Sequence, residues 1–388
     1  MAITLLNCNV VDLEHEGIHE NTNIIIKDDI IKKVDPQQKE GQIIDMKESF
    51  ILPGLFNMHN NLSLISPSGE FDPIESPATT VLRCYKRALD ALYSGVTTLR
   101  TVGEMHRVDI HLRKMINDRW VKGPRIVAGG KGLFVTSGHG SNLYEMGIDG
   151  PEELLKAART ELAFGADHLK IAITGGIAEE FASPQMTFDE IKTVASSARS
   201  KGKYVTAHAG GSGPILTAVE AGVTCFEHGY ALNSEAAKAI KKAGGYLVPT
   251  LSVTRSPDWY KSQGFNEGML KVLSYGKSHL DAIKNAIDAG VTILNGTDIP
   301  PGDLNGDINA TVREIEFLMD AGLNSNEALR SSTTLCANLC GIGDKVGLIK
   351  AGYCADLIAV PGNPLSNIRH MRQIKFVMKN GELIKNEL

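Results

Sequence analysis

Apolar and polar positions follow two different rhythms through the middle of the chain, from about residue 51 onward. Short β-rich runs are separated by longer stretches with helical spacing, such as the one behind the capping box Thr187-x-x-Glu190. The pairs Ala221-Gly222 and Ala289-Gly290 mark where helices end and strands follow. Eight strands are predicted in this region, over Phe50–Phe56, Val96–Val102, Arg125–Ala128, His168–Ile173, Tyr204–Ala209, Thr224–His228, Tyr246–Thr250 and Thr292–Asn295.

This alternation of strands and helices predicts the fold class. Strands that alternate with crossover helices form a parallel sheet. Eight such units favour a closed (β/α)8 TIM-type barrel, and an open doubly wound sheet is the alternative that the pattern leaves. We therefore expect an α/β protein with a barrel over residues 51–346.

Both ends of the chain have a different character. Near the N-terminus, Asn21–Lys27 and Ile30–Val34 predict a hairpin, and no long helical period occurs before residue 75. Near the C-terminus, Ala355–Val360 and Ile374–Met378 predict strands, and Asn380-Gly381 favours a tight hairpin. The simplest arrangement pairs residues 1–50 and 347–388 into one small β-domain beside the barrel.

Composition and charge exclude several classes of protein. The chain of 388 residues carries a formal net charge of −5 and no Lys/Arg-rich block, so we expect no nucleic-acid partner. We find no signal-peptide pattern and no run of 18 apolar residues, so we expect a cytoplasmic protein without a membrane span. The six cysteines are scattered and are expected to be free thiols; Cys225, close to His228, is expected to be buried rather than nucleophilic.

Candidate catalytic residues stand at or just beyond the ends of predicted strands. In a parallel barrel the carboxyl ends of the strands carry the functional groups. Imidazole and carboxylate groups are common ligands of first-row metals, whereas a lysine among them makes chemical sense if carbon dioxide converts its neutral amine into an anionic carbamate. The residues concerned are His59, Lys170, His208, His228 and Asp298.

The sequence resembles the amidohydrolase superfamily over nearly its whole length, in particular the imidazolonepropionase-like and Xaa-Pro dipeptidase-like branch. This resemblance implies a (β/α)8 barrel beside a β-sandwich built from both termini, and a divalent metal, zinc by default, with manganese, iron or cobalt as alternatives. The motifs that carry it are Pro53–His59, Gly95–Arg100, Gly123–Arg125, Gly138–Gly140, His168–Lys170, Ala207–Ala209, Glu227–Gly229, Gly296–Asp298 and Gly352–Pro364.

The resemblance also assigns roles to single residues. His59 matches the first His of a His-x-His pair, Lys170 the carbamylated lysine that bridges two metals, and His208 and His228 the ligands of the second metal. Asp298 matches an aspartate that binds metal and carries a proton. His139 and Tyr230 match positions near the substrate, with loop packing as the alternative role.

One departure from the pattern bears on the number of metals. Asn61 stands where the second His is expected, and Asn57 where an Asp is usual. Asn61 is included in the predicted ligand set, since its amide oxygen is a hard, weak ligand. Three interpretations stay open: two metals with Asn61 as a ligand, one metal on Lys170, His208 and His228, or an inactive site.

The remaining histidines and one glutamate receive weaker predictions. Glu104 and His106 are minor candidates for substrate contact, and His168 is expected to pack in the core. The others, His15, His19, His111, His279 and His370, are expected on the surface.

The predicted function is hydrolysis of a C–N bond, such as an amide or cyclic amide, in a small molecule. Metal would lower the pKa of a bound water from about 15.7 toward roughly 7, and Asp298 would carry the proton. A ring-closing enzyme that uses the same site in reverse and a non-catalytic barrel are the alternatives. Oligomeric state stays open, with a homo-oligomer as the general expectation.

Overall fold

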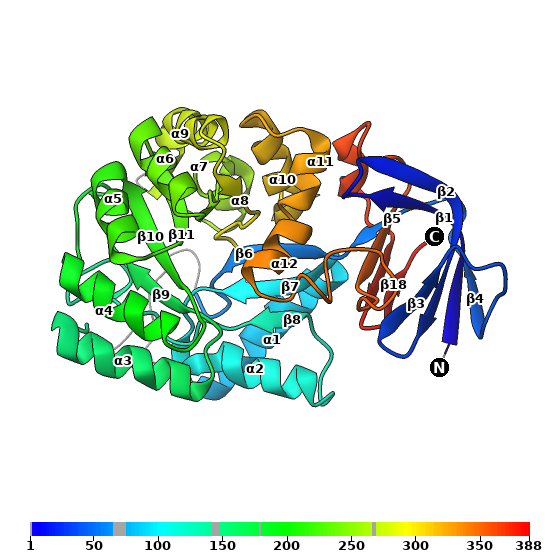
Figure 1. Ribbon diagram of the computed structural model, residues 1–388, viewed down its shortest axis with the longest axis horizontal. Coiled ribbons are helices and arrows are strands. Elements are labelled where there is room, and N and C mark those ends of the chain that lie inside the picture. The colour runs from blue at the N-terminus through cyan, green and yellow to red at the C-terminus, as the bar shows by residue number, and fades with distance from the viewer. Residues whose placement is uncertain (1, 65–74, 142–146, 178–179, 266–268) are drawn as a thin grey trace.

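We describe a computed structural model of the chain that covers residues 2–64, 75–141, 147–177, 180–265 and 269–388. Figure 1 shows a large α/β body and a separate β-rich unit that contains both the N-terminal and C-terminal strands. Among the described residues, no helix combines the length and the apolar character that crossing a membrane requires.

The large body is built around eight parallel strands in two hydrogen-bonded groups. Backbone bonds join the groups at both seams: Met58 N donates to Asn295 O at 2.8 Å, and Asp167 N, just before β9, donates to Ala128 O, just after β8, at 2.7 Å. The predicted (β/α)8 barrel is thereby confirmed, and the open sheet is not what forms. In spatial order the groups are β6 (Leu55–Asn60), β7 (Val96–Thr101) and β8 (Arg125–Val127), and then β9 (Leu169–Ala172), β10 (Val205–Gly211), β11 (Cys225–Ala231), β12 (Tyr246–Val248) and β13 (Thr292–Ile293).

Helices surround the strands and bury one face against them. The predicted capping box is present: the Thr187 hydroxyl and the Glu190 carboxylate each accept from the other's backbone N–H at the start of α4. The helices are α1 (Pro77–Tyr93), α2 (Val108–Asn117), α3 (Gly150–Phe164), α4 (Phe188–Arg199), α5 (Ser212–Ala221), α6 (Ser234–Lys242), α7 (Ser252–Arg255), α8 (Pro257–Ser262), α9 (Gly276–Asp288), α10 (Ala310–Asp320), α11 (Ser325–Arg330) and α12 (Thr334–Leu339).

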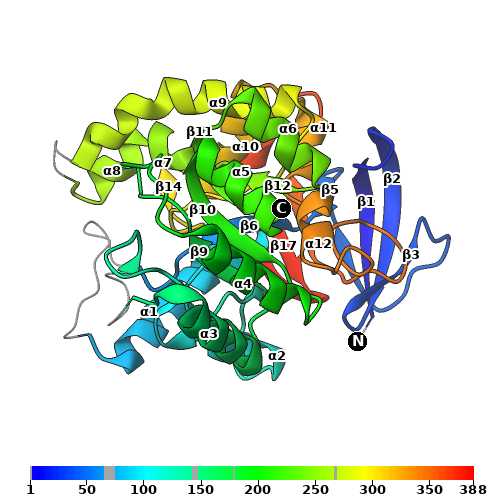
Figure 2. The ribbon, with the colours of Figure 1, turned by 60° about the vertical axis from the view of Figure 1, so that its left-hand side comes forward.

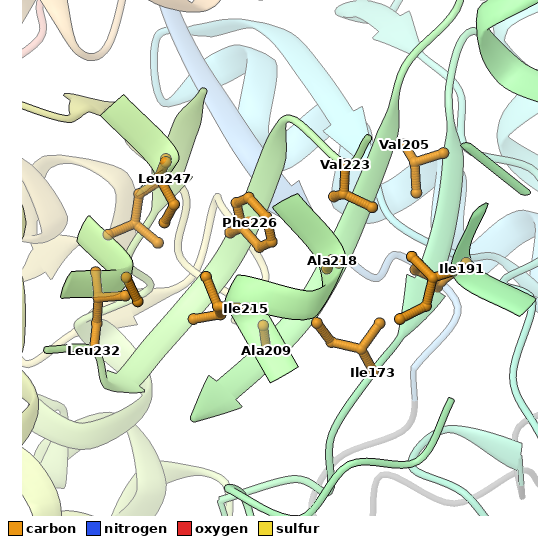
Figure 3. Packing of buried hydrophobic residues seen from close by; sticks show 14 of the residues in the cluster. Ile173, Ile191, Val205, Ala209, Ile215, Ala218, Val223, Phe226, Leu232 and Leu247 are labelled. Atoms are coloured by element: carbon orange, nitrogen blue, oxygen red, sulfur yellow. The ribbon is translucent and has the colours of Figure 1, made fainter. Parts of the chain in front are cut away.

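The hydrophobic core fills the space between strands and helices. Figure 3 shows Ile215 and Ala218 of α5 in one cluster with Ala209 and Phe226 of the neighbouring strands. Burying a side chain as large as Phe226 contributes about 1.5–3 kcal/mol, so this layer fixes the positions of the strand ends.

The small unit is one eight-stranded sheet whose inward side chains form their own cluster. Its order is β18-β17-β16-β5-β1-β2-β3, with β4 paired to β1, so strands from both ends of the chain are hydrogen-bonded together (Figure 2). Both predicted hairpins form, with Lys27 opposite Ile30 and Lys379 opposite Glu382. The strands are β1 (Ala2–Asp12), β2 (Gly17–Lys27), β3 (Ile30–Val34), β4 (Gln42–Asp45), β5 (Phe50–Pro53), β16 (Leu357–Val360), β17 (Phe376–Lys379) and β18 (Glu382–Asn386).

One predicted strand is wrong as a single element. The run over Phe50–Phe56 is divided at Gly54: β5 pairs with β1 and β16 of the small sheet, and β6 begins the barrel. A Cβ at Gly54 would lie 2.2 Å from the Thr97 hydroxyl, so only glycine fits at this crossing point. The first barrel strand therefore begins at Leu55. The predicted domain limits stay a prediction.

Candidate metal centre

Three of the predicted ligands meet at one end of the barrel. His59 lies near the end of β6, His228 lies in the middle of β11 just after its pairing with β12 ends, and Asp298 follows β13. One possible ligand atom from each of the three lies within 4.8 Å of the others. Both histidines are buried, whereas the Asp298 side chain keeps 22% of its surface exposed. The site is therefore formed inside the barrel and opens to solvent on the Asp298 side.

The backbone around these ligands is unusual for non-glycine residues. His228 has φ of 71° and Asp298 has φ of 57°, both in the left-handed region. Such conformations cost free energy and persist where surrounding contacts hold them. Asn57 supplies one such contact, because its Oδ1 accepts from the backbone N–H groups of both His59 and Thr297 at 3.2 Å. Asn57 therefore ties the β6 end to the loop that carries Asp298.

His59 is held between two carboxylates. Its Nδ1 lies 2.7 Å from Glu227 Oε2, and its Nε2 lies 3.2 Å from Asp298 Oδ1. Burial opposes protonation of His59, but Asp298 and Glu227 outweigh burial and raise the pKa of the imidazole. Since Glu227 accepts at Nδ1, the Nε2 lone pair of a neutral His59 faces the Asp298 side.

Glu227 is the centre of a buried polar network that the sequence analysis did not identify. Arg100 donates to Glu227 Oε1 at 2.5 Å and to the Met58 carbonyl at 2.6 Å, and the Thr206 hydroxyl also bonds to Glu227. Burial alone would raise the pKa of Glu227, but Arg100 and then His59 hold it well below its usual range. The carboxylate is thus ionised and orients the His59 ring.

His208 and His228 are neutral imidazoles whose rings lie side by side. Their centroids are 4.4 Å apart. Burial, followed by nearby positive groups, lowers the pKa of each ring well below its usual value. His208 Nε2 bonds to the Gly175 carbonyl at 2.9 Å, and His228 Nδ1 bonds to the Thr250 hydroxyl at 2.7 Å. Each ring keeps its other nitrogen available as a metal ligand.

Lys170 points its amine into the same buried region from β9. Its residue surface is 4% exposed, and burial lowers the pKa of the amine against the attraction of Glu227 and Asp298. The pairing of β9 with β10 sets Lys170 opposite Thr206 and Ala172 opposite His208, so the Lys170 and His208 side chains leave the same face of the sheet. The lowered pKa makes the neutral amine available, as carbamylation requires.

Asn61 contacts Asp298 directly. Its Nδ2 donates to Asp298 Oδ1 at 2.9 Å. Burial acts to raise the pKa of Asp298, but His59 and the other positive neighbours lower it overall. The amide nitrogen of Asn61 therefore faces an ionised carboxylate, and its role as a metal ligand stays a prediction.

His139 and Tyr230 stand against the histidine pair. The His139 ring lies 4.1 Å from that of His208, and the Tyr230 ring stacks on His228 at 5.0 Å. Tyr230 also meets Phe181 edge-on at 5.9 Å. Their positions suit contact with a substrate, but this role stays a prediction.

The two minor candidates for substrate contact, Glu104 and His106, lie in different surroundings. Glu104 is buried and accepts from Leu62 N at 2.6 Å and Ser63 N at 2.8 Å, so it holds the loop after Asn61; burial raises its pKa to about 8. His106 is exposed.

Three of the remaining residues from the sequence analysis are fully buried. His168 and Cys225 are fully buried, as predicted. The expectation for His279 is wrong, because this residue is fully buried against the site rather than on the surface.

The donor set suits a first-row divalent cation. Two imidazole nitrogens and a carboxylate oxygen converge from three different segments of the barrel, and the imidazoles are oriented by bonds to Glu227 and Thr250. Such a ligand set is typical of zinc and its neighbours rather than of magnesium or calcium. The residues present thus fit the group that the resemblance implies.

Comparisons with known proteins agree with this geometry. The model of the amidohydrolase family matches residues 50–384. The ochratoxinase of Aspergillus niger is 28% identical over 373 residues, which cover 86% of this chain and 75% of that protein. The crystal structure of a Xaa-Pro dipeptidase with bound methionine in its active site matches 100% of both chains, with 29% identity and a TM-score of 0.89. A prolidase crystal structure complexed with N-methylphosphonate-L-proline also matches 100% of both chains, with 25% identity and a TM-score of 0.89.

Proposed function

The chain belongs to the amidohydrolase family and is a hydrolytic enzyme that acts on C–N bonds, and we propose that it cleaves an amide bond of a small molecule with the help of a divalent cation. The observation that carries this proposal is the convergence of His59, His228 and Asp298 within 4.8 Å. Three ligands of this kind leave room for a water or a substrate oxygen, as in catalytic rather than structural metal sites.

His59, His228 and Asp298 would hold the cation, with His208 and Lys170 beside them. When bound, the cation would supply Lewis acidity, which polarises a carbonyl and acidifies a water. The protein's own contribution is orientation: Glu227 fixes His59, and Thr250 fixes His228. Zinc is the expected metal, with manganese, iron or cobalt as alternatives.

Asn61 acts on Asp298 in this proposal rather than on the cation. The bond from its Nδ2 to Asp298 Oδ1 at 2.9 Å supports this choice, since a flipped amide would set two acceptors against each other. A second metal position, which needs the second His of a His-x-His pair as a ligand, then binds metal only weakly. The site therefore holds one tightly bound cation. The strained backbone and retained charge of Asp298 support an active site over an inactive one.

Lys170 contributes as a carbamate. The neutral amine attacks the carbon of carbon dioxide, a C–N bond forms as one C=O π bond gives its electrons to oxygen, and one proton leaves the nitrogen to solvent, so the neutral amine becomes an anionic carbamate. The lowered pKa of the amine supports the first step. Its place on the same sheet face as His208, on the neighbouring strand, supports a role for the product as an oxygen ligand.

Asp298 carries the proton of the reaction. Its carboxylate is ionised and partly open to solvent, so it can accept a proton from the attacking water and deliver it to the leaving nitrogen. The proton thus ends on the amine product, and water is consumed across the C–N bond.

The substrate class follows from the relatives and from the groups around the site. The similar solved structures include a Xaa-Pro dipeptidase and a prolidase, which supports dipeptides and N-acyl amino acids as the first compounds to test. His139 and Tyr230, which lie against His208 and His228, would contact the part of the substrate next to the scissile bond.

A substrate panel tests the proposal. Metal-replete protein is incubated with Xaa-Pro dipeptides, other dipeptides, N-acyl amino acids and cyclic amides, and products are detected by mass. Gain of one water that stops on chelation and returns with metal supports the proposal. Loss of one water instead would favour the ring-closing reaction, and hydrolysis that chelation leaves unchanged would overturn the dependence on metal.

A further inference from the structure

His279 is a buried histidine that reaches the candidate metal centre from a helix. It lies in the first half of α9, and its side chain is fully buried. Its Nε2 lies 3.1 Å from the carbonyl oxygen of His228, and its Nδ1 lies 3.0 Å from the Thr254 hydroxyl. It contacts the main chain of a proposed ligand without belonging to the ligand set.

The contacts define how the His279 ring is protonated. A carbonyl oxygen can only accept, so Nε2 carries the hydrogen and donates to His228. A neutral imidazole carries one N–H, so a ring that donates from Nε2 accepts at Nδ1. The Thr254 hydroxyl therefore donates to Nδ1, and the ring is fixed at both nitrogens.

The carbonyl that His279 holds belongs to a strained residue. The pairing of β11 with β12 ends at Glu227 opposite Val248, one residue before His228. His228 then adopts φ of 71°, a conformation that needs support from its surroundings. The bond from His279 supplies that support where the strand pairing has ended.

The same ring also packs against a predicted substrate contact. The Tyr230 ring meets His279 edge-on at 4.9 Å and stacks on His228 with an interplanar angle of 14°. Tyr230 is thus enclosed by the two histidines, and its place depends on both.

We propose that His279 is a positioning residue that fixes the left-handed backbone of His228, and thereby sets the direction of the His228 ring toward the cation. The inference rests on the proposed metal dependence. A change at His279 should alter the affinity for metal and the geometry around it, which a loss of general stability would not do.

Two polar substitutions of His279 separate its two hydrogen bonds. In His279→Gln the side-chain amide reaches as far as Nε2 and can still donate to the His228 carbonyl. In His279→Asn the shorter amide reaches only the Nδ1 position and keeps the contact with Thr254. Ile283→Ala is the matched control, because Ile283 is fully buried one turn further along the same helix.

The measurements are Co²⁺ affinity and the visible spectrum of the Co²⁺-loaded protein, with thermal melting of each variant as a check on folding. We expect His279→Asn to weaken Co²⁺ binding about tenfold or more and to change the spectrum, on the scale typical of groups that orient metal ligands. His279→Gln should stay close to wild type in both. Ile283→Ala should melt at a lower temperature yet bind Co²⁺ with wild-type affinity and spectrum.

The inference is overturned if His279→Asn matches wild type in affinity and spectrum, or if Ile283→Ala weakens Co²⁺ binding as much as His279→Asn does. A wild-type protein that binds no Co²⁺ would instead remove the proposed function on which the inference rests. The two failures are therefore distinguished by the wild-type measurement alone.

Discussion

Glu227 accepts a hydrogen bond from His59 across 2.7 Å, although 168 positions separate the two residues in the sequence. The partner on the other side of Glu227 is Arg100, which is equally buried. This relationship sets which nitrogen of His59 faces Asp298. The buried Arg100–Glu227 pair therefore orients one of the proposed metal ligands.

Replacing Glu227 by Gln should weaken metal binding about 10–100-fold, because the amide is a poorer acceptor for His59 Nδ1. The folded state should also lose about 3–5 kcal/mol, since Arg100 stays buried without its counter-charge. Metal titration and chemical denaturation measure the two effects.

Asp356→Asn is the control for this substitution. Asp356 is a buried carboxylate that pairs with Lys379 of the small unit and with Arg125 at the start of β8, the opposite end of the barrel from the site. The Asp356→Asn substitution should lower the stability of the folded state and leave metal affinity unchanged. An equal loss of affinity in the Glu227→Gln and Asp356→Asn variants would contradict a specific role for Glu227.

Replacing Asp298 by Asn should lower kcat by about 10²–10⁴-fold, because the amide cannot accept and return a proton. Steady-state kinetics on whichever amide the substrate panel identifies provide the measurement. Asp303→Asn serves as the control, since Asp303 bonds to the Trp259 indole five residues further along. Turnover of the Asp298 variant within about tenfold of wild type would rule out its role in proton transfer.

Replacing Asn61 by His should raise the metal content from about one ion per chain toward about two, because imidazole restores the second donor of the His-x-His pair. Replacing Asn61 by Ala should leave the metal content of the wild type, since the proposal gives Asn61 a bond to Asp298 and no bond to metal. Elemental analysis of both variants decides the matter, and loss of metal from the Ala variant would show that Asn61 is a ligand.

Acid should destabilise the folded state in part through His168. Burial lowers its pKa from 6.5 to about 3, and its Nε2 donates to the Thr101 carbonyl at 3.0 Å. Below pH 6.5 the unfolded chain binds a proton at this residue that the folded chain does not, so stability is full above that pH and falls toward pH 3. The slope is about 1.4 kcal/mol per pH unit for one such group.

The His168→Gln variant tests this slope. Its free energy of unfolding, measured by denaturant titration of metal-free protein between pH 6 and 4, should fall less steeply than that of wild type by about that amount. Parallel slopes in the two proteins would show that His168 does not contribute.

Much of the fold could be predicted because local signals and tertiary structure agree. The Thr187–Glu190 capping box and the Asn380-Gly381 turn each form where the sequence indicates. The strand over residues 50–56 was misjudged because β5 and β6 are both almost continuously buried, so hydrophobicity shows no break between them. The Pro53-Gly54 pair is the signal that could have divided the run.

The site residues that stand at strand ends could be predicted. The residues that support them from other parts of the sequence could not. Arg100 and Glu227 come from different strands, and no local pattern pairs residues 127 positions apart. His279 was taken for a surface residue because it lies outside the predicted strand ends. Its spacing to Ala282, Ile283 and Ala286, all buried on one face of α9, is the signal that could have placed it inside.

The most direct test of the central claim is the metal content of the purified chain after reconstitution with zinc. Wild type and the exposed-histidine control His111→Ala should retain about one ion per chain, whereas His228→Ala should retain less than about 0.1. Less than about 0.1 ion in reconstituted wild type, or equal content in the His228 variant and wild type, would contradict a metal centre built on His59, His228 and Asp298.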